Sequence, residues 1–237
     1  MISPLKDDEK ERVMKAVLLR ISAMFLAVSA VASCTYQGGD IGDPLIRKAQ
    51  WFSFVEGEDI RATCAAGTPD RARLVYNGIY DEQLRIYEVD AVRRLLTIRV
   101  IQPGNAARLS GDDLTAPWRA LEEKVQLDQP SYDRLVESFA QGGVYAPPPV
   151  GLELPSRSYF WTAATCKNGQ YGFTAWKYPS AEFDRLGFDK NLLALDPTGV
   201  PVNQPKPAQF DPQWEDKAKR LETPVFSLRV AAHGLVH

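Results

Sequence analysis

The chain has 237 residues and a formal net charge of −2 at pH 7, from 28 basic and 30 acidic side chains. This near balance lacks the basic excess of nucleic-acid-binding proteins, so we expect no nucleic-acid partner. Hydrophobic residues make up 45% of the chain, which is the fraction of a globular protein and excludes an intrinsically disordered one.

The N-terminal region has the composition of a secretory signal peptide. Residues 14–20 carry two positive side chains and no acid, and residues 21–32 form an almost wholly apolar run that ends in small residues. The run is shorter than the ~20 residues that a membrane-spanning helix needs. Residues 1–13 carry four acidic side chains, an unusual composition ahead of such a run. We therefore expect translation to start at Met14 and residues 1–33 to be cleaved.

The tetrapeptide Val31-Ala32-Ser33-Cys34 directly follows the apolar run, although Ala30-Val31-Ala32 also fits the ordinary signal peptidase. The tetrapeptide resembles the lipobox of bacterial lipoproteins, and the resemblance covers residues 14–35 only. It implies that Cys34 receives a diacylglycerol and becomes the mature N-terminus. In enterobacterial lipoproteins a residue such as Thr35, in place of aspartate, favours the outer membrane. We therefore expect a lipid-anchored protein of the cell envelope that faces the periplasm.

Lipidation of Cys34 would leave the other two of the three cysteines, Cys64 and Cys166, as a pair. The periplasm is an oxidising compartment, so two remaining thiols there are expected to form a disulfide. This bond would join an early helix to a later hairpin. We therefore predict a single globular domain over residues 51–237.

Residues 34–50 are predicted to form the lipidated N-terminus and a flexible tether, because three glycines and a proline fall within them. The apolar segment 51–55 fits either a strand or the start of the next helix. Residues 56–66 predict that short helix, with acidic side chains at the end where the helix dipole favours negative charge. Gly67 and Pro69 follow it as stop signals.

Residues 71–102 predict a meander of antiparallel strands. The segments 84–89 and 95–101 alternate apolar and polar side chains, which is typical of strands with one buried face. Between the first two strands, Asn77-Gly78 fits either a two-residue turn or the interior of a strand.

A helix and a second β unit follow. Asp128 can cap a helix over residues 128–142, in which apolar side chains recur every three or four positions. Residues 158–178 predict a β-hairpin whose two-residue turn is Asn168-Gly169.

The C-terminal third of the chain contains weaker signals. Residues 181–196 predict a short helix, Asp211-Pro212 begins another, and residues 225–230 predict a last strand. The fold class is therefore α+β: a mostly antiparallel sheet built from two hairpin or meander units, with about three helices and one disulfide.

Four aromatic side chains share one face of the predicted hairpin. With a two-residue turn, Trp161 lies opposite Trp176 and Tyr159 lies opposite Tyr178. In one interpretation both faces of the hairpin are buried. In the other, the aromatic face is open and binds glycan rings or the side chains of a partner protein.

Few residues suit catalysis or metal binding. The two histidines, His233 and His237, lie at the C-terminus, where chains usually fray. No phosphate-binding, dinucleotide-binding or zinc-protease motif occurs, so the sequence predicts no cofactor, no metal site and no catalytic residue. Asp112-Asp113 fits a turn better than it fits a metal or acid–base site.

Two classes of function remain. The first is a membrane-anchored envelope lipoprotein whose periplasmic domain binds an envelope protein or a glycan. The alternative is a periplasmic hydrolase that acts through paired carboxylates, which the many acidic residues permit. A deep pocket with converging acids would favour the hydrolase, and an aromatic groove would favour the binding domain.

Overall fold

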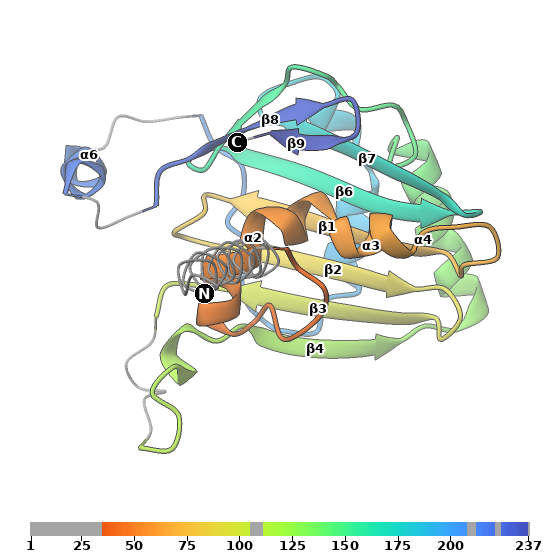
Figure 1. Cartoon of the computed structure of the whole chain (residues 1–237), viewed down its shortest axis with the longest axis horizontal. Helices are drawn as coiled ribbons and strands as arrows, with labels where there is room; N and C mark the ends of the chain where they lie inside the picture. Colours follow the sequence, from red (N-terminus) through yellow and green to blue (C-terminus); the bar gives the residue numbers. More distant parts are fainter. Residues whose placement is uncertain (1–34, 105–110, 208–211, 221–223, 237) are drawn as a thin grey trace, which may run out of the picture. The chain divides into compact units, whose positions relative to one another are not determined.

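The structure is a computed structural model that describes residues 35–104, 111–207, 212–220 and 224–236. The signal-peptide and lipidation predictions, including Cys34, therefore lie outside the described residues. Residues from Tyr36 onward form one compact unit (Figure 1). Within the described part of the chain, no helix is long and apolar enough to cross a membrane.

A six-stranded antiparallel sheet is the centre of this unit, with strands in the order β4-β3-β2-β1-β6-β7 (Figure 1). A second, three-stranded antiparallel sheet has the order β5-β8-β9. The predicted α+β class is confirmed, although the described residues contain five α-helices rather than about three, and β5 and β9 were not predicted. The strands are β1 (Arg71–Gly78), β2 (Leu84–Asp90), β3 (Leu95–Ile101), β4 (Leu121–Gln126), β5 (Glu153–Pro155), β6 (Tyr159–Lys167), β7 (Gln170–Lys177), β8 (Ser227–Ala231) and β9 (Gly234–Val236). The helices are α2 (Pro44–Glu56), α3 (Glu58–Thr63), α4 (Gln129–Gln141), α5 (Phe188–Ala194) and α6 (Pro212–Lys219).

The two predicted β units join edge to edge in this sheet. β1 of the first unit pairs with β6 of the second over eight residues, with Leu74 opposite Ala163 and Arg73 opposite Ala164. Each of these two strands is also paired on its other side, so both lie in the interior of the sheet. The pairing makes one sheet from segments that are about ninety residues apart in sequence.

Each face of the large sheet has its own hydrophobic core, because strand side chains alternate between faces. On one face α4 and α5 contribute Leu135, Phe139, Phe188 and Leu192. On the other face α2, α3 and the small sheet cover the strands (Figure 1). The buried residues that these elements contribute to the second core include Trp51, Phe54, Val55, Ile60, Leu154, Leu228 and Val230.

The helix expected over residues 56–66 is α3, which spans only Glu58–Thr63, and Glu56 is already the last residue of α2. Asp43 caps the start of α2, and Gly57 ends it with a left-handed φ of 76° before α3 begins. A Cβ at Gly57 would lie 2.4 Å from the Cβ of Ala164 on β6, so only glycine permits this close approach. Residues 51–55 consequently belong to α2, and the strand interpretation of that segment is wrong.

The tether prediction for residues 34–50 is wrong from Tyr36 onward. Tyr36 is 6% exposed and Ile41 is fully buried, and α2 already begins at Pro44. Gly38 and Gly39 have φ values of 116° and 117°, so they turn the chain back onto the domain instead of extending it. Glycine content alone did not distinguish a tight turn from a flexible linker.

The two Asn-Gly pairs have different roles. Asn168 and Gly169 have φ values of 52° and 73° and form the predicted two-residue turn between β6 and β7. Asn77 instead lies inside β1, where its buried side-chain amide donates hydrogen bonds to the carbonyls of Ser156 and Ser158. The tertiary partners of Asn77 therefore decide between the two interpretations that the sequence left open.

The predicted disulfide between Cys64 and Cys166 is confirmed, with a Cα–Cα distance of 5.6 Å and a sequence separation of 102 residues. Cys64 caps the end of α3, and Cys166 is buried near the end of β6 beside Phe173. The bond therefore fixes α3 to the interior of the sheet.

Replacing both cysteines with alanine should lower the free energy of unfolding by about 4 kcal/mol, because a bond that closes a loop of this length restricts the unfolded chain. Urea denaturation of the Cys64→Ala/Cys166→Ala protein measures the change, and the wild type under reducing conditions is the matched control. An unchanged unfolding midpoint in both samples would contradict this account.

Candidate functional site

The aromatic face of the β6–β7 hairpin is buried, so its interpretation as an open binding surface is wrong. Trp161 and Trp176 do lie directly opposite each other as predicted, but they are 2% and 8% exposed. The ring of Phe188 on α5 covers both, at 5.5 Å from Trp161 and 5.2 Å from Trp176 between ring centroids. Tyr159 is 4% exposed, and Tyr178 packs beside it against Phe183.

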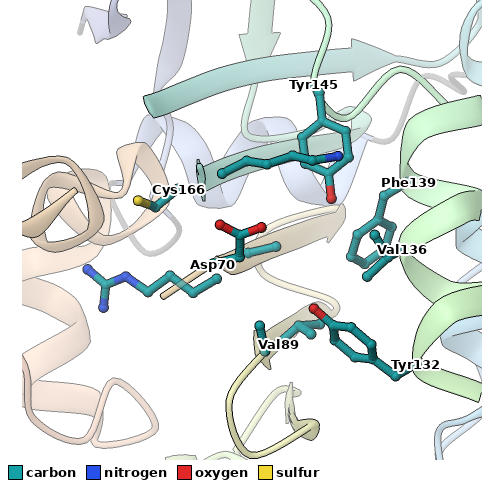
Figure 2. A pocket seen from close by; sticks show the side chains of 11 residues that line it. Asp70, Val89, Tyr132, Val136, Phe139, Tyr145 and Cys166 are labelled. Carbon is teal, nitrogen blue, oxygen red and sulfur yellow. The ribbon is translucent and has the colours of Figure 1, made fainter. Parts of the chain in front are cut away.

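A small cavity lies between this hairpin and α4 (Figure 2). It is lined by Asp70, Tyr132 and Tyr145 among others, and the ammonium of Lys167 lies 3.7 Å from the centre of the Tyr145 ring. Burial raises the pKa of Tyr145 to about 12. The volume of about 20 Å³ holds about one water molecule, far below the roughly 300 Å³ of a small-molecule site.

Two larger hollows are open to solvent. The first, which we name the charged groove, has a volume of about 690 Å³ and lies beside α3 over β1 to β4. Its lining combines basic and acidic side chains, including Arg71, Arg73, Glu88, Asp90, Arg99 and Lys124.

The charges in this groove form a ladder of ion pairs across the strands. Arg73 is 3% exposed and binds Asp59 of α3 at 2.8 Å and Glu88 of β2 at 2.9 Å. Glu88 also pairs with Arg99 on β3, and Arg99 reaches Glu122 on β4 at 2.7 Å. Adjacent antiparallel strands bring these residues side by side, so each acid has a basic neighbour.

The protonation of Glu88 follows from this ladder. Burial raises the pKa of its carboxyl group, but the charges of Arg73 and Arg99 outweigh burial, so its pKa lies below the ordinary value of 4.5. A general acid for glycoside cleavage needs a raised pKa instead. The converging acids of this groove therefore act as partners of arginines and do not form a poised acid–base pair.

The second hollow, which we name the aromatic groove, has a volume of about 510 Å³ and lies along the first turns of α2. Its walls are mainly aromatic and apolar side chains, including Trp51, Phe52, Tyr80, Ile101, Trp118 and Phe226.

The aromatic rings of this groove support one another edge to face. Tyr80 lies 5.7 Å from Trp51 and 4.9 Å from Phe226, and Phe52 lies 5.0 Å from Phe226. Such pairs are favourable because the positive edge of one ring meets the negative face of the next. Trp118 is 50% exposed and presents its indole to solvent at the wall.

Backbone contacts hold Trp118 in place. The guanidinium of Arg47 donates hydrogen bonds to the carbonyls of Trp118 and Gly42, each at 3.0 Å. The indole lies so close to Gly104 that a Cβ there would be 2.3 Å from its Nε1 atom. Both contacts fix the half-exposed tryptophan at one place on the wall.

Sequence reasoning did not find the aromatic groove. Its lining comes from residues 44–52, 80–84, 101–104, 118 and 224–226, which only the fold brings together. Trp118 follows Pro117 in a short 3₁₀ turn. The one signal in the sequence was an aromatic residue in a loop. Such a residue does not show which distant segments of the chain will lie beside it.

The sequence also drew attention to Asp113 and to the two histidines. Asp113 accepts hydrogen bonds from the Thr115 hydroxyl and from Arg119, and these contacts lower its pKa to about 2. His233 lies between β8 and β9, and His237 is outside the described residues. Among the residues that the structure describes, no group of three His, Cys, Asp or Glu side chains could hold a metal ion.

Neither a scan against protein-family models nor a search of the curated proteins finds a match to this chain.

A Glu88→Gln variant should be less stable than the wild type by about 2 kcal/mol near neutral pH, because Arg73 and Arg99 lose a shared charged partner. The folded-state pKa of Glu88 lies below its unfolded value of 4.5, so its contribution is complete above that pH. The contribution disappears as pH falls through the lower folded-state pKa. The difference between the two proteins should therefore shrink below about pH 4.5.

Urea unfolding from about pH 3 to about pH 7 measures this difference. Glu123→Gln, which removes an exposed carboxylate of β4 in the same sheet, is the control and should show little change. A destabilisation by Glu88→Gln that grows on acidification would contradict the ion-pair assignment.

Proposed function

We propose that the chain is a lipid-anchored protein of the bacterial cell envelope, attached to the outer membrane through Cys34, whose periplasmic domain binds a partner protein in the aromatic groove. The lipobox directly behind an apolar run supports the anchor. The open aromatic groove of the folded domain supports the binding role.

The aromatic groove is the observation that carries this proposal. Its volume of about 510 Å³ falls within the range of binding sites, and its walls are rigid rings that lose little entropy on binding. Aromatic side chains with part of their surface exposed are the usual centres of binding energy at protein interfaces. Trp118 meets this description, since half of its surface is open.

An apolar peptide segment fits the groove better than a glycan does. Sugar hydroxyls need several polar partners, whereas this wall is formed mainly by aromatic, aliphatic and proline side chains. The guanidinium of Arg47 lies in the wall but already donates to two backbone carbonyls. Lys48 remains at the exposed rim of α2, where it suits an acidic side chain next to the apolar segment.

The hydrolase alternative has less support. The acids that converge in the charged groove are paired with arginines, and the pKa of Glu88 is lowered rather than raised. A binding role, in contrast, requires no such acid pair and needs only an exposed surface such as the aromatic groove.

A Cys34→Ser substitution should leave the precursor uncut or release the protein into the soluble fraction, because two or more acyl chains are needed for stable anchoring and serine accepts none by this route. Fractionation and intact-mass measurement of the mature protein test this expectation. A wild-type N-terminus other than Cys34, or one without lipid mass, would contradict the proposed anchor.

A photo-crosslinking residue at Lys48 should capture a protein partner in intact envelopes, whereas the same residue at Val150, which is 66% exposed and outside the groove, should not. Adding Trp118→Ala should reduce capture strongly, because a central tryptophan contributes about 2 kcal/mol, or about thirty-fold in affinity. Gly104→Ala should also reduce capture. Its methyl group would push the Trp118 indole from its position on the wall, although the tryptophan itself is still present.

Circular dichroism confirms that each variant is folded before capture is compared. A product that disappears on digestion with a muramidase identifies a glycan instead of a protein. Equal capture at both positions, or capture insensitive to both substitutions, would contradict the groove as the binding site.

A further inference from the structure

We propose that the charged groove lies against the phospholipid headgroups of the membrane in which the protein is anchored, so that the domain rests on the bilayer. This inference depends on the proposed lipidation of Cys34. It adds a second contact, between the folded domain and the lipid surface, to the covalent anchor.

The start of the folded domain is fixed at Tyr36. Its backbone amide donates a 2.8 Å hydrogen bond to Oγ of Ser53, and its hydroxyl donates to the carbonyl of Gly39. Its ring meets Phe54 edge to face at 4.8 Å, and the residue is 6% exposed. These contacts with α2 leave Tyr36 no freedom to act as part of a linker.

The chain between the proposed anchor and this fixed residue is very short. Cys34 precedes Tyr36 by two positions, and a fully extended chain spans at most about 3.6 Å per residue. The lipidated residue therefore lies within about 7 Å of Tyr36, whatever path the chain takes. The surface of the domain around Tyr36 must consequently lie next to the bilayer.

The charged groove adjoins this point. The guanidinium of Arg73 lies 5.3 Å from the centre of the Tyr36 ring, and Arg73 also lines the groove. Arg73 binds Glu88 at 2.9 Å and Glu88 pairs with Arg99, so these two residues that line the groove belong to the same ion-pair cluster as Arg73. A membrane that is held near Tyr36 is therefore held near the mouth of the groove.

The chemistry of the groove suits a layer of phospholipid headgroups. Basic and acidic side chains alternate across its strands, as Arg73, Glu88 and Arg99 do, and a zwitterionic headgroup likewise carries one phosphate and one ammonium group. The side chains of Arg93 and Lys124 are 76% and 58% exposed, so each can also reach an anionic surface beyond its ion pair with Asp90 or Glu122. Val92, which is 72% exposed at the β2–β3 turn, adds an apolar contact.

The opposite face of the sheet provides an internal control. It is covered by α4, whose Leu135 and Phe139 pack into the other core. Glu137 points to solvent from that helix. A probe at Glu137 should therefore be separated from the bilayer by the thickness of the domain.

The test uses the full lipidated protein in vesicles of phosphatidylethanolamine and phosphatidylglycerol with a nitroxide quencher on some headgroups. Because Cys64 and Cys166 are bonded to each other, Arg93→Cys and Glu137→Cys each provide one thiol for a fluorophore. Quenching at position 93 should exceed that at position 137 several-fold. Ten glycine and serine residues inserted between Thr35 and Tyr36, with a root-mean-square span of about 17 Å, should largely remove this difference.

Flotation of the vesicles tests the lipid anchor independently of the contact between the charged groove and the bilayer. A protein that neither floats nor carries lipid mass overturns both the anchor and the inference that depends on it. A protein that floats with equal quenching at both positions retains the anchor and overturns the contact between the charged groove and the bilayer. A difference that persists unchanged after the insertion overturns the inference as well, because the placement of the groove against the bilayer depends on the short connection.

Discussion

The buried guanidinium of Arg73 is the interaction on which the arrangement of α2, α3 and the start of the domain depends. A charge that is 3% exposed requires close partners, since an unpaired one would destabilise the fold by several kcal/mol. Arg73 takes these partners from three elements: Asp59 of α3, Glu88 of β2 and the carbonyl of Phe54 on α2. The rings of Phe54 and Tyr36 lie over it and favour the cation further. One side chain therefore contacts two helices and Tyr36, where the compact unit begins.

This arrangement covers part of one sheet face and leaves other parts open. Next to α3 the strands carry charges that pair with one another, which keeps them compatible with water or with lipid headgroups. Along the first turns of α2 the strands end, and aromatic side chains from α2 and from separate loops line this margin without closing it. The two grooves thus differ in chemistry because one is lined mainly by strands and the other mainly by α2 and the loops beside it. In the function proposed above, this difference assigns the membrane and the protein partner to different places on one domain.

Features that depend on neighbours in sequence were predictable. The register of the β6–β7 hairpin follows from its two-residue turn, which places Trp161 opposite Trp176 because side chains alternate strictly along paired strands. The helix capped by Asp128 follows from its cap and its apolar period. The bond between Cys64 and Cys166 followed from the number of cysteines once Cys34 was assigned to lipid. Each of the three inferences uses spacing or counting, and none requires knowledge of what packs on the element.

The sequence by itself therefore determined the fold class, the register of one hairpin and the pairing of two cysteines. Only the tertiary structure decided which surfaces are open. Alternation showed that four aromatic side chains share a face, but Phe188 on α5, a residue distant along the chain, covers the two tryptophans. Glycines at residues 38 and 39 fitted a tether, but the burial of Tyr36 made them a turn. Burial depends on contacts between remote segments, and those contacts have no local signature in the sequence.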